Sequence, residues 1–540
     1  MAITPEREDA LDEYVDIDPA AAIATDDEHS LSIKEAFKRY PSSVFWAIAM
    51  SLTIVMEGYD TILIGSLFAY PSFVDKYGVY EPNLGQKSIT GAWQAGLVNA
   101  SSCGAVIGLV INGYVTEKFG HRIVTMIALV VMSAFIFITF FAPSIQVLTA
   151  GQVLVGIPWG IFAIMGSAYS SEVCPLALRG YLTSFVNICW VIGQFVAAGV
   201  LQGLVNNNTV WSFRIPFAIQ WAWPIPLFIL ALLAPDSPWW LVRKGRLADA
   251  EKSIRKLSSG LTDTQVKQKL AMMVHTDKFE KAVQAESSYR DCFKGTNLRR
   301  TEIACMILSA QTLPGEAMCY SASYFFTQAG LPSADAYKLN LGSIALAFIA
   351  TCLSWVLMTF FGRRTLLITG LGLLTLDLLV IGCLSYATGS SAQWAQSALA
   401  MLWLGIYSAT LGPQSFALAA EISATRLRSQ TISLARNAYN VVNIVDNTVE
   451  TYLINPTAAN LKGKTAFFWF GLGVLTTTWA VFRLPETKNR TYEELDVLFE
   501  RHVPAWKFSS AQIDVVAETE IIQAGEKGDK AQQIEFAEAV

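Results

Sequence analysis

Two acidic side chains stand within an otherwise apolar stretch near the N-terminus. Glu57 and Asp60 interrupt the apolar segment 43–65, and their spacing places both on one face of a helix. In a membrane span a carboxylate costs roughly 2.5–3.5 kcal/mol on insertion scales, so it usually faces a cavity and serves function. A like-charged neighbour also favours the protonated form of a carboxyl group. The pair predicts a site that binds and releases a proton; the alternative is an acid that bonds a neighbouring helix.

Amide and aromatic side chains recur at helical spacing in three later segments. Amides and hydroxyls can hydrogen-bond the hydroxyl groups of a sugar, and aromatic faces can cover its C–H surfaces. The sets are Asn187, Trp190 and Gln194 in 181–204; Gln311, Tyr320 and Tyr324 in 302–327; and Asn437, Asn440 and Asn443 in 431–453. They predict a sugar site, although hydrogen bonds between helices, worth about 0.6–2 kcal/mol per pair, would explain the same residues.

The elements that position these residues are apolar and long. Of the 540 residues 53% are hydrophobic and 15% are charged, whereas a soluble domain has about 25% charged residues. Twelve apolar segments approach the ~20 residues that a helix needs to cross a bilayer, and backbone groups in lipid must bond within the segment. They are 43–65, 90–114, 122–142, 147–168, 181–204, 214–234, 302–327, 339–361, 365–386, 392–418, 431–453 and 464–484. We therefore expect an all-α membrane protein with twelve transmembrane helices and no binding of nucleic acid.

Three short charged motifs occur twice in the same order. The pairs are GYVTEKFGHR (113–122) with TFFGRR (359–364), SEVCPLALRG (171–180) with AEISATRLRSQ (420–430), and PDSPWWL (235–241) with PETKNR (485–490). Their offsets, read from Gly120/Gly362, Glu172/Glu421 and Pro235/Pro485, are 242, 249 and 250 residues. A repeat of apolar segments at this spacing predicts two homologous six-helix bundles.

The basic loops between the spans fall on one side of a twelve-helix arrangement. Because Lys and Arg concentrate on the cytoplasmic side, both termini are expected there. The expected division is a disordered cytoplasmic tail (1–41), an N-terminal bundle (42–234), cytoplasmic linker helices (235–300), a C-terminal bundle (301–486) and a cytoplasmic tail (487–540). The first span is expected to be an internal anchor rather than a cleaved signal.

The repeated motifs carry opposite charges at helix ends. Such pairs can bond in one conformation and separate in another, which predicts a gate whose pairs form only when the two bundles close on the cytoplasmic side. Ordinary positive-inside anchoring is the alternative. The predicted gate residues are Glu117, Arg122, Glu172, Arg179, Arg363, Arg364, Glu421 and Arg428.

These motifs resemble those of the sugar porter family of the major facilitator superfamily, over about residues 40–500. The motifs EKFGHR (117–122), PDSP (235–238), EI (421–422) and PETK (485–488) carry this resemblance. More narrowly, the chain is similar to the fungal α-glucoside (maltose-type) proton symporters, through MEGYDT (56–61), GIPWG (156–160), VNICWVIGQ (186–194), RRTE (299–302) and RNAYN (436–440).

The resemblance implies roles for individual residues. It implicates Glu57 and Asp60 in proton coupling, and Asn187, Gln194, Gln311 and Asn437 match sugar-contacting positions. Phe416 stands where many hexose porters have tryptophan. Apart from the resemblance, Arg436 also falls in a predicted span and could act as a counter-charge to Glu57 or Asp60. Two positions depart from the pattern: Gln152 replaces an arginine and Ala105 replaces an acid.

The expected function is import of an α-glucoside such as maltose with a proton, by a monomer in the plasma membrane, without cofactor or metal. The alternatives are an uncoupled facilitator of a hexose or polyol, which Gln152 and Ala105 favour, and a transporter-like sugar receptor. An enzyme is not expected, because the chain has no nucleotide loop, metal cluster or nucleophile motif. Glu316, Asp377 and the glycosylation sequon at Asn207 receive no role.

Overall fold

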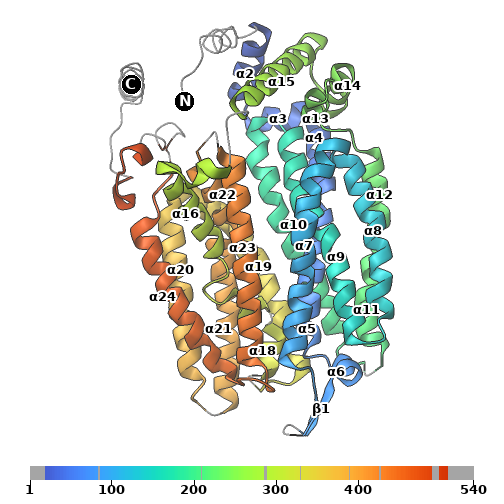
Figure 1. The fold of residues 1–540 in the computed structure, drawn as a ribbon, viewed down its shortest axis with the longest axis vertical. Helices are drawn as coiled ribbons and strands as arrows, with labels where there is room; N and C mark the ends of the chain where they lie inside the picture. The colour runs from blue at the N-terminus through green and yellow to red at the C-terminus, as the bar shows by residue number, and fades with distance from the viewer. Residues whose placement is uncertain are drawn as a thin grey trace, which may run out of the picture.

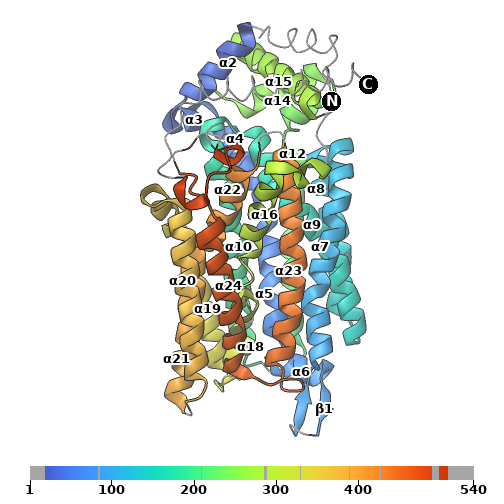
Figure 2. The same ribbon diagram turned by 60° about the vertical axis from the view of Figure 1, so that its left-hand side comes forward.

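A computed structural model describes residues 19–82, 85–207, 209–284, 289–320, 322–328, 330–387, 389–424, 427–488, 490, 495 and 498–508. Long helices run side by side along the longest axis, and the N-terminal and C-terminal halves stand next to each other (Figure 1). A layer of short helices covers one end, seen at the top of Figure 2, and a β-hairpin lies at the other. We call these ends the linker face and the hairpin face.

The N-terminal half contains six spans, two of which consist of consecutive shorter helices. They are α4 (Pro41–Ser51) with α5 (Thr53–Leu67), α7 (Gly91–Phe119), α8 (His121–Phe141), α9 (Ile145–Val173), α10 (Leu176–Leu204), and α11 (Trp211–Ile219) with η1 (Gln220–Ala222) and α12 (Pro224–Leu233). Small residues let α7 and α9 approach closely. A Cβ on Gly104 would lie 2.0 Å from the Val153 carbonyl oxygen, and one on Gly156 would lie 2.2 Å from that of Ser101.

The C-terminal half repeats this arrangement. Its spans are α16 (Gly295–Ser309) with α17 (Glu316–Tyr320) and α18 (Ala322–Gln328), α19 (Ser333–Phe360), α20 (Arg363–Leu384), α21 (Ser390–Ala409) with α22 (Leu411–Ile422), α23 (Arg428–Ile454), and η4 (Lys462–Lys464) with α24 (Thr465–Arg483). The two six-helix bundles and the twelve spans predicted from the sequence are therefore present.

Within the described residues, nine helical segments are long and apolar enough to cross a membrane on those two criteria alone. The other three predicted spans all lie in the C-terminal half. The α16–α18 and α21–α22 spans are interrupted, and α23 carries a series of asparagines and acids. Broken or polar helices are tolerated at membrane depth where they line a cavity, and these three helices do so, as described below.

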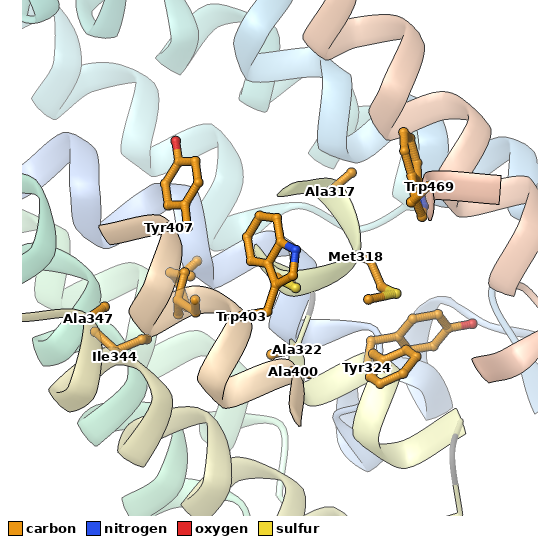
Figure 3. Packing of buried hydrophobic residues seen from close by; sticks show 14 of the residues in the cluster. Ala317, Met318, Ala322, Tyr324, Ile344, Ala347, Ala400, Trp403, Tyr407 and Trp469 are labelled. Carbon is orange, nitrogen blue, oxygen red and sulfur yellow. The ribbon is translucent and has the colours of Figure 1, made fainter. Parts of the chain in front are cut away.

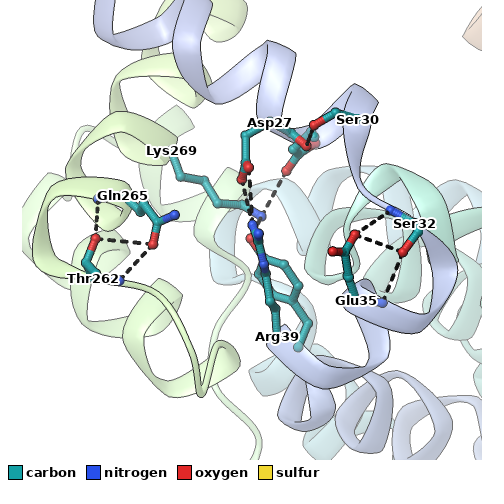
Figure 4. Close-up of polar contacts among 10 residues, drawn as sticks. Asp27, Ser30, Ser32, Glu35, Arg39, Thr262, Gln265 and Lys269 are labelled. Atoms are coloured by element: carbon teal, nitrogen blue, oxygen red, sulfur yellow. Dashed lines mark hydrogen bonds and ion pairs between the residues drawn. The ribbon is translucent and has the colours of Figure 1, made fainter.

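The linker face is built by α13 (Pro238–Arg243), α14 (Leu247–Leu257), α15 (Asp263–Gln284) and η2 (Tyr289–Phe293). The expectation of a wholly disordered tail at 1–41 is wrong for residues 19–39, which form α2 (Pro19–Ser30) and α3 (Ile33–Arg39). Ala21 and Ala24 of α2 are buried against the linker helices. Lys269 of α15 pairs with Glu28 at 2.9 Å and contacts Tyr40 (Figure 4). Composition showed an excess of acid there but not the basic partner that neutralises it.

The start of the predicted C-terminal tail (487–540) packs against the helices of the protein. Phe499 and Phe508 are fully buried in the main apolar cluster, and the Arg299 guanidinium lies 5.3 Å from the Phe499 ring. A 3₁₀ turn, η5 (Ala505–Lys507), precedes Phe508. At the hairpin face, α6 (Pro71–Tyr77) leads into β1 (Val79–Glu81), which pairs antiparallel with β2 (Gln86–Ser88).

Candidate functional site

Helices of both bundles line one cavity of about 260 Å³. The N-terminal bundle contributes side chains from α5, α7, α9 and α10, and the C-terminal bundle from the α16–α18, α21–α22 and α23 spans, with Thr351 of α19. The polar and aromatic lining residues are Glu57, Asp60, Thr61, Ser101, Ser102, Trp159, Asn187, Trp190, Gln194, Gln311, Glu316, Tyr320, Thr351, Tyr407, Ser408, Phe416, Arg436, Tyr439, Asn440, Asn443 and Asn447. This composition combines the two types of group, titratable acids and hydroxyl-binding amides, that the sequence singled out.

Both acids of α5, Glu57 and Asp60, face this cavity. Asp60 is 5% exposed, and its Oδ1 accepts a hydrogen bond from Gln220 Nε2 at 2.8 Å, so it also bonds a neighbouring helix as the alternative interpretation anticipated. Glu57 Oε2 has no hydrogen-bond partner among the described residues. Gly58, which lies between the acids, lets α5 touch α10, since a Cβ there would stand 2.2 Å from the Trp190 carbonyl oxygen. This close contact brings the acids beside the polar face of α10.

Arg436 of α23 faces the same cavity as Glu57. Among the described lining residues it alone carries a positive charge. Its guanidinium lies 5.2 Å from the Phe416 ring and 4.9 Å from the Tyr439 ring, and such cation–π contacts hold the group in place. The packing of α23 thus brings Arg436 to the cavity that the two acids line, a placement that the sequence alone did not reveal.

Eight of the ten residues predicted for the sugar site lie in the cavity lining: Asn187, Trp190, Gln194, Gln311, Tyr320, Phe416, Asn440 and Asn443. Two do not. The Tyr324 hydroxyl accepts a hydrogen bond from Gln94 Nε2 at 3.2 Å, in a contact between the bundles. Asn437 is exposed on the outer side of α23.

The cavity-facing side of α23 runs from Arg436 through Asn440 and Asn443 to Asn447. Asn437 follows Arg436 by one residue, which turns it about 100° from that stripe in an α-helix with 3.6 residues per turn. Of the three asparagines predicted for the sugar site on this helix, Asn440 and Asn443 therefore face the cavity and Asn437 does not. The sequence also gave no reason to choose Tyr407 of α21, because a tyrosine in an apolar helix is most often a packing residue.

Ala105 and Gln152, the two positions that depart from the family pattern, differ in whether they line the cavity. Ala105 lines the cavity, so an acid there would have faced the site. Gln152 of α9 is buried with no hydrogen-bond partner for Oε1 among the described residues, and it is not part of the lining. The N-terminal bundle thus presents Glu57 and Asp60 to the cavity without a basic residue of its own in the described lining.

At the linker face, the predicted gate residues pair with residues of their own half of the chain. Glu172 contacts Arg243 at 2.5 Å and His121 at 3.6 Å, and Arg363 contacts Glu421 at 3.6 Å. In each pair both partners belong to one half of the chain, so these pairs do not bridge the two bundles in the described conformation, and their making and breaking during transport stays a prediction.

The remaining gate residues behave similarly. Arg122 donates to the Leu232 carbonyl at 2.5 Å, and Arg364 donates to the carbonyls of Leu484 and Val481, both at 2.8 Å. The Glu117 side chain is exposed. The side chains of Arg179 and Arg428 lie outside the described part of the structure.

At the hairpin face the two bundles are joined to each other. Asn99 Nδ2 of α7 donates to Thr448 Oγ1 of α23 at 2.8 Å, and Asn455 Nδ2 donates to the Ile89 carbonyl at 3.0 Å. The Tyr337 hydroxyl donates to the Ser66 carbonyl on the other side of the interface. These contacts hold the two bundles together at the hairpin face.

Comparison with known proteins gives a consistent result. The family described as "Sugar (and other) transporter" matches residues 46–499. The chain is 39% identical over 497 residues to the general alpha-glucoside permease of Saccharomyces cerevisiae (91% of this chain, 80% of the permease). It is 37% identical over 515 residues to maltose permease MAL61 of the same yeast (94% and 83%).

Solved structures show the same fold. The proton:xylose symporter XylE bound to 6-bromo-6-deoxy-D-glucose matches with a TM-score of 0.67 and 20% identity, over 85% of this chain and all of that one. The inward open conformation of XylE from E. coli matches with the same TM-score and identity, over 84% and 98%. With a family match over most of its length and a cavity between two six-helix bundles, the chain belongs to the sugar (and other) transporter family of major facilitator membrane transporters.

Proposed function

We propose that this protein imports an α-glucoside disaccharide such as maltose together with a proton, by alternating access. The observation that carries the proposal is the shared cavity, in which Glu57 and Asp60 face the same space as Asn187 and Gln194. A titratable pair beside hydroxyl-binding amides is what coupling a proton to a sugar requires. The yeast relatives named as alpha-glucoside and maltose permeases indicate the class of sugar.

The linker face is assigned to the cytoplasm. Its loops carry Lys118, Arg122, Arg363, Arg364 and Lys488, and such basic loops stay on the cytoplasmic side. With the hairpin face closed by hydrogen bonds between the bundles, the described conformation corresponds to an inward-facing or occluded step. We place the transporter in the plasma membrane as a functional monomer with both termini inside.

In this mechanism the acids control which form of the carrier can reorient. With a proton on the Glu57–Asp60 pair, the sugar-loaded cavity can close, because no uncompensated charge is then buried. Loss of the proton on the inner side adds a negative charge to the pair, and the positive charge of Arg436 on the facing bundle attracts it. Return is then favoured only after sugar and proton have both left.

External pH and labelled maltose uptake, followed together in weakly buffered cells that lack their own sugar transporters, test the coupling. Alkalinisation in step with uptake is expected. Asp60→Asn should abolish accumulation of maltose and spare its exchange down a gradient. Asp377→Asn is the matched control, because Asp377 is equally buried but not part of the cavity lining.

Two results would contradict this assignment. Undiminished accumulation in Asp60→Asn would remove that acid from the mechanism. Uptake by the unmodified protein without any change in pH would instead make it an uncoupled facilitator, the second candidate function, which the uncharged Gln152 and Ala105 favour.

A further inference from the structure

Glu316 is an acid of the C-terminal bundle to which the proton mechanism gives no task. It is the first residue of α17, directly after the interruption that separates α16 from α17. Gly315 fixes this interruption, since it has φ +90° and a Cβ there would lie 3.2 Å from the Trp469 side chain. The break is therefore packed in place, and it presents Glu316 to the sugar cavity, where the residue is 7% exposed.

One hydroxyl group serves two acceptors beside Glu316. The Tyr407 hydroxyl lies 3.3 Å from Glu316 Oε1 and 3.4 Å from Gln311 Oε1. Its ring is stacked on that of Trp403 with centroids 5.4 Å apart, and Figure 3 shows the two side chains next to each other, so packing holds the tyrosine in place. A tyrosine has a single proton to donate, hence one of the two acceptors stays unsatisfied at any moment.

A further acceptor adds to this excess. Glu316 Oε2 is buried and has no hydrogen-bond partner among the described residues. The amide of Gln311 makes no bond to Glu316 Oε2: one of its two Nε2 hydrogens goes to the Leu308 carbonyl at 3.3 Å, and Oε2 has no partner among the described residues. Arg436 faces the same cavity, but no ion pair within 4 Å joins it to Glu316 in the described part of the chain. This wall of the cavity thus has more hydrogen-bond acceptors than donors, and it suits a ligand that can donate hydrogen bonds.

We propose that Glu316 is a sugar-recognising residue, whose carboxylate accepts hydrogen bonds from hydroxyl groups of the bound α-glucoside. The inference rests on the proposed function and extends it, because it assigns recognition to an acid in the C-terminal bundle, opposite the Glu57–Asp60 pair. A hydrogen bond to a charged acceptor is among the strongest that a neutral ligand can make. The site should therefore discriminate against a sugar that lacks the matching hydroxyl.

The test compares maltose with a set of monodeoxy maltoses, by calorimetric titration of the purified full-length protein. The unmodified protein should bind maltose at least about tenfold more tightly than one analogue, since a hydrogen bond to a charged group contributes roughly that much. In Glu316→Ala this ratio should fall to near one. Glu316→Gln keeps a neutral acceptor and should retain a ratio of about three, because neutral hydrogen bonds are about half as strong.

Glu450→Gln is the matched control. Glu450 is a buried acid of the same bundle, but it bonds Trp469 Nε1 at 2.6 Å and is not part of the cavity lining; its glutamine can keep that bond. Its ratios should equal those of the unmodified protein. If the affinity ratios of both Glu316 variants equal those of the unmodified protein for every analogue, the inference about Glu316 is overturned, but the proposed transport function still stands. Failure of the unmodified protein to bind any α-glucoside would overturn the proposed function, and this inference with it.

Discussion

The hydrogen bond between Asn99 and Thr448 is the contact whose removal should most cleanly shift the transport equilibrium. It joins α7 to α23 at the hairpin face at 2.8 Å. Asn99→Ala removes the donor without leaving the Thr448 hydroxyl unpaired, because Thr448 Oγ1 still donates to the Ile444 carbonyl at 2.7 Å. A neutral hydrogen bond of this kind contributes about 0.6–1.5 kcal/mol.

This free energy is present only while the bundles are closed at the hairpin face. Its loss should therefore raise the ratio of hairpin-open to hairpin-closed molecules about threefold to tenfold, since 1.4 kcal/mol corresponds to a factor of ten. Thr448→Ser keeps the hydroxyl acceptor and should behave like the unmodified protein. Thr448→Val should shift the ratio in the same direction, and combining it with Asn99→Ala should add little, because both remove one bond.

Distances between spin labels at the hairpin face measure the ratio. Val79 and Tyr386 are suitable sites, because they lie in opposite bundles and are 62% and 67% exposed. The label requires a background in which the exposed cysteines, Cys103, Cys352 and Cys383, are replaced by serine. In Asn99→Ala the longer-distance population should grow by the stated factor. An unchanged distance distribution would refute the reasoning that this contact holds the outer side closed.

Two further predictions concern stability and the linker face. Gly156→Ala should lower the thermal unfolding temperature in scanning fluorimetry, because its Cβ would lie 2.2 Å from a backbone oxygen of α7 and overpacking costs about 1–3 kcal/mol. Gly96→Ala is the control and should leave this temperature unchanged, because a Cβ there meets nothing within 4 Å. Equal effects of the two substitutions would contradict the close packing of α7 and α9. Burial lowers the pKa of Lys269, but the facing Glu28 and Tyr40 more than offset this, so that its pKa is raised. The pairing therefore stabilises the docked α2 below the ordinary lysine pKa of about 10.4 and is lost as the pH rises through the raised value. Limited proteolysis of residues 19–40 should be slow at pH 8 and faster above pH ~10.4. At pH 8 the Glu28→Gln variant should be cleaved several-fold faster than the unmodified protein. Equal cleavage of the variant and the unmodified protein would show that the Lys269–Glu28 pair does not hold α2 in place.

Much of the fold followed from local signals in the chain. The repeated charged motifs identified two halves, and the apolar segments located twelve helices, because both signals depend on residues close together in sequence. The chemistry of the site was also visible, since Glu57 and Asp60 are costly in an apolar helix and had to serve a purpose. The sequence could therefore determine that the chain is a transporter with acids and amides in its spans.

The tertiary structure decided which of these residues meet. Helical periodicity could not separate Asn437 from Asn440, because only the packing of α23 against α7 and α16 fixes which side faces the cavity. Glu172 forms an ion pair with Arg243, which lies on a helix that the sequence analysis assigned to the linker region. Glu316 was an unexplained acid until the break at Gly315 placed it beside Tyr407. Periodicity specifies the faces of single helices, whereas a cavity forms where several helices pack, and that arrangement depends on contacts between residues far apart in the chain.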